Sequence, residues 1–252
     1  MGASKNLKAV DACAHLGEGR HLSLCTDDLL AQMDEAHIAR TVVSPVDHYL
    51  AVHNREGNDL VLSAVRAHSD RLTGMASANP WFGDAAVEEV RRALGEGLSG
   101  LVIHSIYQGF RLADHVVNPI LEVVADFDVP VYAHTGTAGQ AEPFHIVDLA
   151  LRFPSVNFIM GHAGSSDYGE DAVRALEFAP NIWLETSRNG PANYGLWKVK
   201  DCLSRMVFGS SAPEYIPATE RDTLCDVFTE DEDQRAVLRD NIQDVFKGRL
   251  AR

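Results

Sequence analysis

The strongest fold signal in this chain lies in two segments, VPVYAHT at residues 129–135 and VNFIMGHA at residues 156–163. Each is a short run of apolar and β-branched residues with a histidine next to its end. Such nearly continuous apolar runs are typical of strands in a parallel sheet that is covered on both faces. The intervening residues 136–155 have room for one crossover helix. The pair therefore predicts a strand–helix–strand unit.

The same alternation of apolar runs and helical stretches extends toward both ends of the chain. Eight units of this kind in about 250 residues are typical of a (βα)8 TIM barrel, an α/β fold. An open, doubly wound sheet usually has a GxGxxG turn after its first strand, whereas this chain has only Gly17-Glu18-Gly19 there. We therefore predict a barrel whose strands lie at residues 8–15, 40–45, 72–80, 98–105, 129–135, 156–163, 181–187 and 205–211.

Three of the helices can be delimited from capping and periodicity. Residues 27–38 follow Thr26, which we expect to be the N-cap, and residues 84–94 repeat apolar side chains at helical spacing. A last helix begins near Asp231 and places Leu238, Ile242 and Val245 on one face. No linker rich in Pro, Gly or Ser interrupts the pattern, so we expect a single domain over residues 1–252.

The charge composition argues against several classes of partner. The chain has 22 Lys and Arg residues against 36 Asp and Glu residues, a formal net charge of −14 at pH 7. This excess repels phosphate backbones and acidic lipids, so we expect neither a nucleic acid nor a membrane partner. The first residues lack the apolar core of a secretion signal, and we expect a cytoplasmic protein.

Polar residues stand where the predicted strands end, which is where barrels of this kind build their active sites. Imidazoles that converge on a barrel mouth serve as metal ligands or as acid/base groups. Taken singly, each histidine could instead be a core residue that hydrogen-bonds a backbone group. The polar residues at the strand ends are His15, His104, His134, His162, Glu185 and Ser211.

Cys13 adds a possible metal ligand to this set. It lies two residues before His15, so both side chains point to the same face of the first strand, where they could bind one ion together. The alternative is that Cys13 is a small buried hydrophobic residue, and the sequence leaves both interpretations open.

Residues just beyond the strands are candidates for binding a small-molecule substrate. Asp47 and His48 follow the second strand, His104 ends the fourth, and Tyr107 and Arg111 lie in the loop after it. An aromatic residue in such a loop is equally often part of the packing beneath it.

Together these residues resemble the amidohydrolase superfamily. The resemblance rests on Asp11 and His15, on His134, on His162 and on the Gly-Ser-x-x-Pro turn after the eighth strand, and it covers almost the whole chain. It points to the amidohydrolase-related (amidohydrolase 2) branch, which contains mononuclear-zinc decarboxylases and lactonases. It implies a metal-dependent hydrolase or decarboxylase that acts on a small cyclic or aromatic carboxylate, lactone or amide. It also implies a homodimer, because barrels of this family often dimerise.

The resemblance further implies a role for each strand-end residue. The family signature Asp-x-His-x-His supplies two zinc ligands, the fifth strand a third, the sixth a catalytic histidine, and the last turn an aspartate that contacts the metal and moves protons. Carried over, Cys13, His15 and His134 are the expected ligands of one zinc or other divalent ion, and His162 is the expected acid/base group. The chain departs at Cys13, which replaces a histidine, and at Ser211, which replaces the aspartate.

These two departures differ in their expected effect on metal binding and catalysis. A thiolate is a good zinc ligand, whereas the hydroxyl of Ser211 cannot take a proton from water as a carboxylate does. With Ser211 in the catalytic position, we expect His162 to be the substitute base, with Glu185 and Asp47 as the next candidates. Decarboxylation is less sensitive than hydrolysis to this loss.

Three interpretations remain open at this stage. The first is a metal-dependent enzyme of this family. The second is an enzyme without metal, in which the histidines, with Tyr107 or Arg111, polarise a carbonyl substrate directly. The third is a non-catalytic barrel that binds a ligand after losing two metal ligands.

Overall fold

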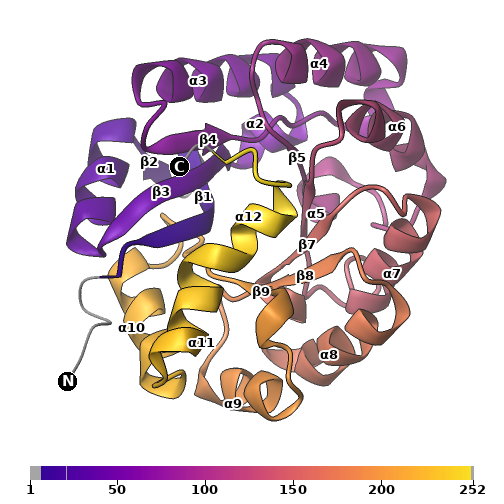
Figure 1. Cartoon of the computed structure of the whole chain (residues 1–252). Coiled ribbons are helices and arrows are strands. Elements are labelled where there is room, and N and C mark those ends of the chain that lie inside the picture. The colour runs from indigo at the N-terminus through magenta and orange to yellow at the C-terminus, as the bar shows by residue number, and fades with distance from the viewer. Residues whose placement is uncertain (1–6, 21, 251–252) are drawn as a thin grey trace.

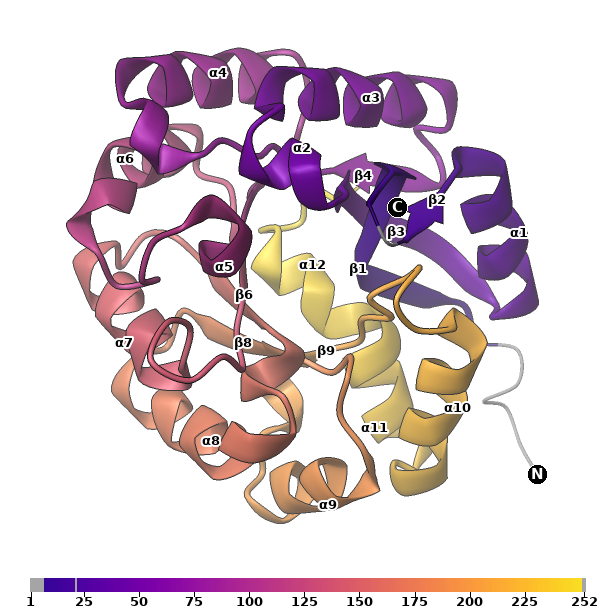
Figure 2. The ribbon, with the colours of Figure 1, turned by 180° about the vertical axis from the view of Figure 1, so that it is seen from behind.

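The computed structural model describes residues 7–20 and 22–250, with only the backbone of Ser166, and it has eight parallel strands enclosed by a ring of helices (Figures 1 and 2). The predicted single domain over residues 1–252 includes residues 1–6, 21, 251 and 252, which lie outside the described residues. The eight strands are β1 (Ala9–Glu18), β3 (Ile38–Pro45), β4 (Leu72–Gly74), β5 (Leu101–Ile103), β6 (Val131–His134), β7 (Phe158–Gly161), β8 (Ile182–Glu185) and β9 (Met206–Val207).

Backbone hydrogen bonds join these strands into a closed barrel. Two ladders run in the orders β1-β3-β4 and β5-β6-β7-β8-β9, and every neighbouring pair in them is parallel. The amide of Ala76 donates to the carbonyl of Gly100 at 2.8 Å and links the end of β4 to β5. The amide of Ala12 donates to the carbonyl of Phe208 at 2.8 Å and links β1 to the residue after β9. The TIM barrel is therefore confirmed, and one strand overlaps each of the eight predicted ranges. The strands β4, β5 and β9 are shorter than the predicted ranges 72–80, 98–105 and 205–211.

Strand β1 differs from its prediction at its far end. It continues beyond His15 to Glu18 and pairs antiparallel with β2 (Ser23–Leu24), a short strand that the sequence did not predict. Gly17 has a φ of +124° at this point, a conformation that favours glycine. This hairpin adds a wall at the barrel mouth, because Leu22 of its turn lines the cavity described below.

The helices lie outside the barrel, apart from the last, and most of them connect successive strands (Figure 1). In the described residues none is long and apolar enough to cross a membrane. They are α1 (Thr26–Glu35), α2 (Asp47–Ala51), α3 (Asn54–Ala67), α4 (Asp84–Gly95), α5 (Ser105–Gln108), α6 (Asn118–Phe127), α7 (Pro143–Arg152), α8 (Gly169–Phe178), α9 (Pro191–Val199), α10 (Pro217–Val227), α11 (Asp231–Arg235) and α12 (Asn241–Val245), with a π-helical turn (Ala236–Asp240) between the last two.

Two details of the helix predictions need correction. The N-cap of α1 is Cys25, whose Sγ accepts a hydrogen bond from the amide of Asp28 at 3.4 Å, and Thr26 is the first helical residue. The helix also ends at Glu35 rather than at residue 38, because His37 adopts a φ of +54° and Ile38 already belongs to β3. The prediction for α4 is confirmed to within one residue.

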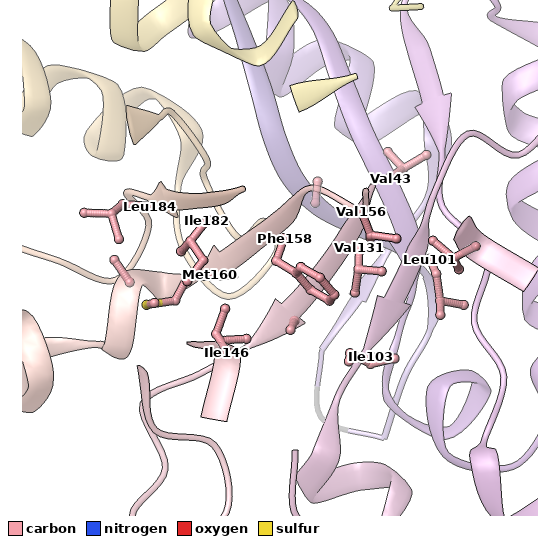
Figure 3. Packing of buried hydrophobic residues seen from close by; sticks show 14 of the residues in the cluster. Val43, Leu101, Ile103, Val131, Ile146, Val156, Phe158, Met160, Ile182 and Leu184 are labelled. Atoms are coloured by element: carbon pink, nitrogen blue, oxygen red, sulfur yellow. The ribbon is translucent and has the colours of Figure 1, made fainter. Parts of the chain in front are cut away.

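Alternate residues of each strand belong to two separate apolar clusters. One face of the strands belongs to the cluster that also contains buried residues of the surrounding helices. Figure 3 shows Val131, Phe158 and Leu184 of this cluster together with Ile146 of α7. The other face supplies a second cluster with Tyr132 and Ile159, which α12 joins through buried residues. Helix α12 crosses one end of the barrel in Figure 1. Of the predicted apolar face, Ile242 and Val245 lie in α12 and Leu238 in the π-helical turn before it, and all three are buried. That end is closed by apolar side chains, so the polar groups gather at the opposite end.

Candidate active site

Four strand-end histidines converge at the carboxyl ends of the strands, and His134 stands at their centre. The ring centroid of His134 lies 5.3 Å from that of His15, 4.3 Å from that of His104 and 5.0 Å from that of His162. Because these residues come from β1, β6 and the turns after β5 and β7, only closure of the barrel brings them together. Such convergence of imidazoles is the arrangement that the sequence predicts.

A cavity of about 130 Å³ opens above this cluster. His162 is not among the residues that line it, because His162 is only 2% exposed and lies behind His134. The apolar wall of the cavity consists of Leu22, Val46, Leu50 and Pro213. The polar residues that line the cavity are His15, Asp47, His104, Tyr107, His134, Arg188 and Glu214.

All four histidines are neutral at pH 7. Burial lowers the pKa of His15 to about 4 and that of His104 to about 3. Burial likewise holds the pKa values of His134 and His162 well below the usual range, and the charge of Arg188 adds to this effect. Each ring therefore carries one N–H donor and one lone pair.

Hydrogen bonds determine which nitrogen of His134 carries its proton. The Ser187 hydroxyl donates to Glu185 Oε2 at 2.9 Å, so this hydroxyl must accept from Nδ1 of His162, 2.8 Å away. His162 Nε2 then holds a lone pair, which accepts from Nδ1 of His134 at 2.9 Å. The remaining lone pair, on His134 Nε2, is buried and has no hydrogen-bond partner. An unpaired buried acceptor beside a cavity is a position for a metal ion or a substrate proton.

Glu185 supports this chain of hydrogen bonds from below. The carboxylate is fully buried and accepts from the Tyr132 hydroxyl at 2.6 Å, from the amide of His162 at 2.9 Å and from Ser187. Burial raises its pKa and these donors oppose the rise. Because every group around it is a donor, we assign the ionised form. Glu185 does not reach the cavity, so its place is that of a positioning group rather than of the base considered from the sequence.

Cys13 and His15 form a second pair on β1. Cys13 Sγ lies 3.6 Å from His15 Nε2, and His15 Nδ1 lies 2.8 Å from the Ser44 hydroxyl. Burial and the nearby charge of Glu185 raise the pKa of the Cys13 thiol well above its usual value, so the group is a thiol in the absence of a cation.

Ser211 is held beside this pair by Asp11. The buried Asp11 carboxylate accepts from the amides of Cys13 and Ser210, at 3.0 and 2.8 Å, and from the Ser210 hydroxyl at 2.6 Å. These bonds tie β1 to the turn after β9. Ser211 follows with a φ of +57°, and its hydroxyl is buried without a partner. No carboxylate therefore occupies the place where the family resemblance implies an aspartate.

The predicted substrate-binding residues separate into two groups. Asp47, His104 and Tyr107 line the cavity, and the rings of the last two stack with centroids 4.1 Å apart. His48 lies beside the cavity and its Nδ1 is 3.0 Å from Asp47 Oδ1. Arg111 is exposed, its Nε donates to the carbonyl of Gly139 at 3.2 Å, and it does not line the cavity.

The sequence did not single out two charged residues that do line the cavity, Arg188 and Glu214. Both lie in loops that follow strands, directly after the predicted strand 181–187 and three residues after the strand 205–211. Their position after a strand was the available signal. Ser44 hydrogen-bonds His15 and Tyr132 hydrogen-bonds Glu185, and neither was predicted as a site residue. Ser187, which hydrogen-bonds His162, ends the predicted seventh strand but was assigned no role.

Comparison with known proteins gives one family and many similar folds. Residues 23–248 match the sequence model of the family described as Amidohydrolase. No curated protein matches the chain at a significant level.

Three solved structures illustrate the shared fold. The 2,6-dihydroxybenzoate decarboxylase from Rhizobium has a TM-score of 0.77 and 17% identity, over 95% of this chain and 98% of that one. The 5-carboxyvanillate decarboxylase from Novosphingobium aromaticivorans, solved with manganese and 4-hydroxy-3-methoxy-5-nitrobenzoic acid, has a TM-score of 0.75 and 16% identity, over 98% and 97%. A protein described as a probable 2-pyrone-4,6-dicarboxylic acid hydrolase from Acinetobacter baumannii, with citric acid bound, has a TM-score of 0.72 and 18% identity, over 96% and 100%.

Proposed function

The chain belongs to the amidohydrolase family, and we propose that it is an enzyme that decarboxylates or hydrolyses a small one-ring carboxylic acid at the barrel mouth. The observation that carries the proposal is the buried, unpaired Nε2 of His134 beside the cavity. Most buried polar atoms have a hydrogen-bond partner, and this unpaired one belongs to a residue that lines the cavity. The cavity of about 130 Å³ suits one ring, since a cavity of about 150 Å³ accepts benzene.

We propose further that Cys13, His15 and His134 hold one divalent ion. The donor chemistry fits, because a thiolate and two neutral imidazoles are ligands that zinc prefers. Tetrahedral zinc would place sulfur and nitrogen ligands about 3.5 Å apart, and Cys13 Sγ lies 3.6 Å from His15 Nε2. Among the described residues no three His, Cys, Asp or Glu side chains are yet gathered tightly enough to hold an ion. His134 would have to shift toward the other two.

The thiol favours zinc over the manganese found in some relatives. Manganese prefers oxygen ligands, whereas this donor set has sulfur and nitrogen only. A relative with bound manganese is the 5-carboxyvanillate decarboxylase. When bound, the ion would polarise a carbonyl or carboxylate oxygen of the substrate.

The protein's own groups then have defined tasks in the reaction. His104 and Tyr107 form a stacked aromatic surface against which a ring can lie. His134 donates its Nδ1 proton to His162 Nε2 in a 2.9 Å hydrogen bond, which would fix the orientation of the His134 ring, and Glu185, whose Oε2 is 3.7 Å from His162 Nδ1, would stabilise positive charge on this pair. The apolar wall excludes water from the reacting atoms.

Serine at position 211 favours decarboxylation over hydrolysis. Hydrolysis needs a base that deprotonates water, and the buried Ser211 hydroxyl cannot act as one. Loss of CO2 needs no deprotonated water. The proton that replaces CO2 on the carbon has to come from the substrate's own ionisable groups or from solvent, because His134 and His162 are neutral and hold their Nδ1 protons in hydrogen bonds. We therefore expect release of CO2 from ring carboxylic acids to exceed hydrolysis of ring lactones when both are assayed.

An enzyme without metal is the second candidate, supported by the hydrogen-bond chain itself. Without an ion, His134 Nε2 would accept a proton from the substrate, and the chain through His162 and Ser187 would spread the charge toward Glu185. The metal content of untagged protein, never exposed to a nickel column or chelator, separates the two candidates. About one zinc per chain supports the first. Metal far below stoichiometry that added zinc does not restore supports the second.

Replacement of Cys13 by serine tests the ligand assignment. We expect C13S to lose the bound ion, and with it the stabilisation by metal, which is about 2.7 kcal/mol at a metal concentration 100 times the dissociation constant. Metal analysis and thermal unfolding with and without zinc measure both effects. The matched control is C202S, at another buried cysteine that lies outside the site, and it should keep its metal. Unchanged zinc content in C13S contradicts the assignment.

A further inference from the structure

Arg188 is the only Lys or Arg residue among the described residues that line the cavity. Arg188 therefore provides the cationic side chain that a bound ligand can meet in this cavity. An anionic ligand would be attracted to this side of the cavity.

The guanidinium group of Arg188 has unused hydrogen-bonding capacity. It carries five N–H donors, and its ion pair with Glu214 is loose, with 3.4 Å between Nη1 and Oε2. Its Nε is buried and has no hydrogen-bond partner. A buried donor left without an acceptor is costly. A ligand that supplies two oxygens would satisfy the planar fork as a carboxylate does.

The backbone holds Arg188 in a conformation that only tertiary contacts can maintain. Its φ is +60°, which a non-glycine residue rarely adopts, and its amide donates to Glu220 Oε2 at 3.2 Å. Strained residues of this kind concentrate at binding and catalytic sites. Glu220 comes from α10, so a contact from another element aims the side chain at the cavity.

We propose that Arg188 binds the carboxylate of the substrate, and that Glu214 occupies this subsite until the ligand arrives. The inference rests on the proposed function and adds the orientation of the substrate. Glu214 has a half-exposed side chain, so it can swing into solvent when a ligand oxygen replaces it.

The anchored carboxylate is the one that remains in the product. A cation paired with a carboxylate stabilises the charged acid more than a transition state in which that charge is leaving as CO2. The substrate therefore carries a retained carboxylate beside the group that reacts. Loss of Arg188 should raise KM more than it lowers kcat.

Binding of benzoate, with neutral benzamide as the paired probe, tests the subsite by isothermal titration calorimetry. Wild-type protein should bind benzoate more tightly than benzamide. The variant R188Q should weaken benzoate binding about 10- to 100-fold and leave benzamide binding unchanged, because a hydrogen bond to a charged group is lost. R188K keeps the charge without the planar fork, and we expect an intermediate loss.

A variant of Glu214 should increase the affinity for benzoate, an effect opposite to that of R188Q and one that misfolding cannot produce. E214Q removes the competing carboxylate, so it should tighten benzoate binding several-fold. The control R91Q removes an exposed charge on α4, outside the cavity, and should change nothing. Full benzoate affinity in R188Q together with no gain in E214Q overturns the inference, whether or not the protein turns over an acid. Arg188-dependent binding without turnover of any acid supports the subsite and removes the proposed enzyme function.

Discussion

Replacement of Glu185 by glutamine is expected to cost about 3 kcal/mol of stability and to lower turnover about 100-fold. The carboxylate is fully buried and accepts from Tyr132, Ser187 and His162, so an amide NH2 in its place would face donors. For a domain of this size the loss corresponds to a fall in Tm of roughly 6–12 °C. Turnover falls because nothing then orients Ser187 and, through it, the tautomer of His162.

Two further variants separate positioning by Glu185 from a merely structural role. Glu122 is exposed on α6, and E122Q should change neither Tm nor turnover. S187A keeps the carboxylate but removes the hydroxyl that joins it to Nδ1 of His162, so we expect a loss of only about 1 kcal/mol in stability with most of the loss in turnover.

Nitrogen-15 NMR of histidine-labelled protein reads the tautomers without a substrate. In metal-free wild-type protein, His134 and His162 should both carry the proton on Nδ1. In S187A this preference should disappear for His162. The same tautomers in S187A and wild type would contradict the assigned chain of hydrogen bonds.

Restoring the family ligands with C13H and S211D together is expected to raise the affinity for a divalent ion about tenfold or more. The pair adds an imidazole and a carboxylate at the two positions that depart from the family signature. Aspartate tolerates the positive φ of position 211 better than most residues. Because oxygen and nitrogen would replace sulfur, the preference should also move from zinc toward manganese.

Metal titration followed by thermal unfolding checks this second expectation. Without metal, the buried carboxylate at position 211 has no cation to offset it, so the double variant should melt below wild type. Metal should then raise its Tm beyond that of the wild type. C13H with S211N has the same shape without the charge and should gain less. No gain in metal affinity in the double variant would mean that the donors around His15 and His134 no longer converge on one point.

The eight strands and the histidines at their ends were readable in the sequence because both signals are local. Apolar runs such as residues 129–135 and 156–163 predict buried parallel strands, and a polar residue at the end of a run marks the barrel mouth. The departures at Cys13 and Ser211 were equally visible, because each falls within a recognisable motif. The ends of helix α1 were less exact, since its capping depends on individual backbone angles.

How deep each histidine lies in the barrel, and which loop side chains face the cavity, depended on contacts between residues far apart in the chain. The sequence placed His134 and His162 at matching strand ends. The structure puts His134 on the cavity and His162 behind it, because β6, β7 and β8 stack the two rings over Glu185. Arg111 appeared to be the available cation, whereas Arg188 lines the cavity. The side that a loop residue faces is set by its φ and by partners such as Glu220 on a distant helix. Hydrophobic periodicity carries no information about such partners, so they became visible only in the closed barrel.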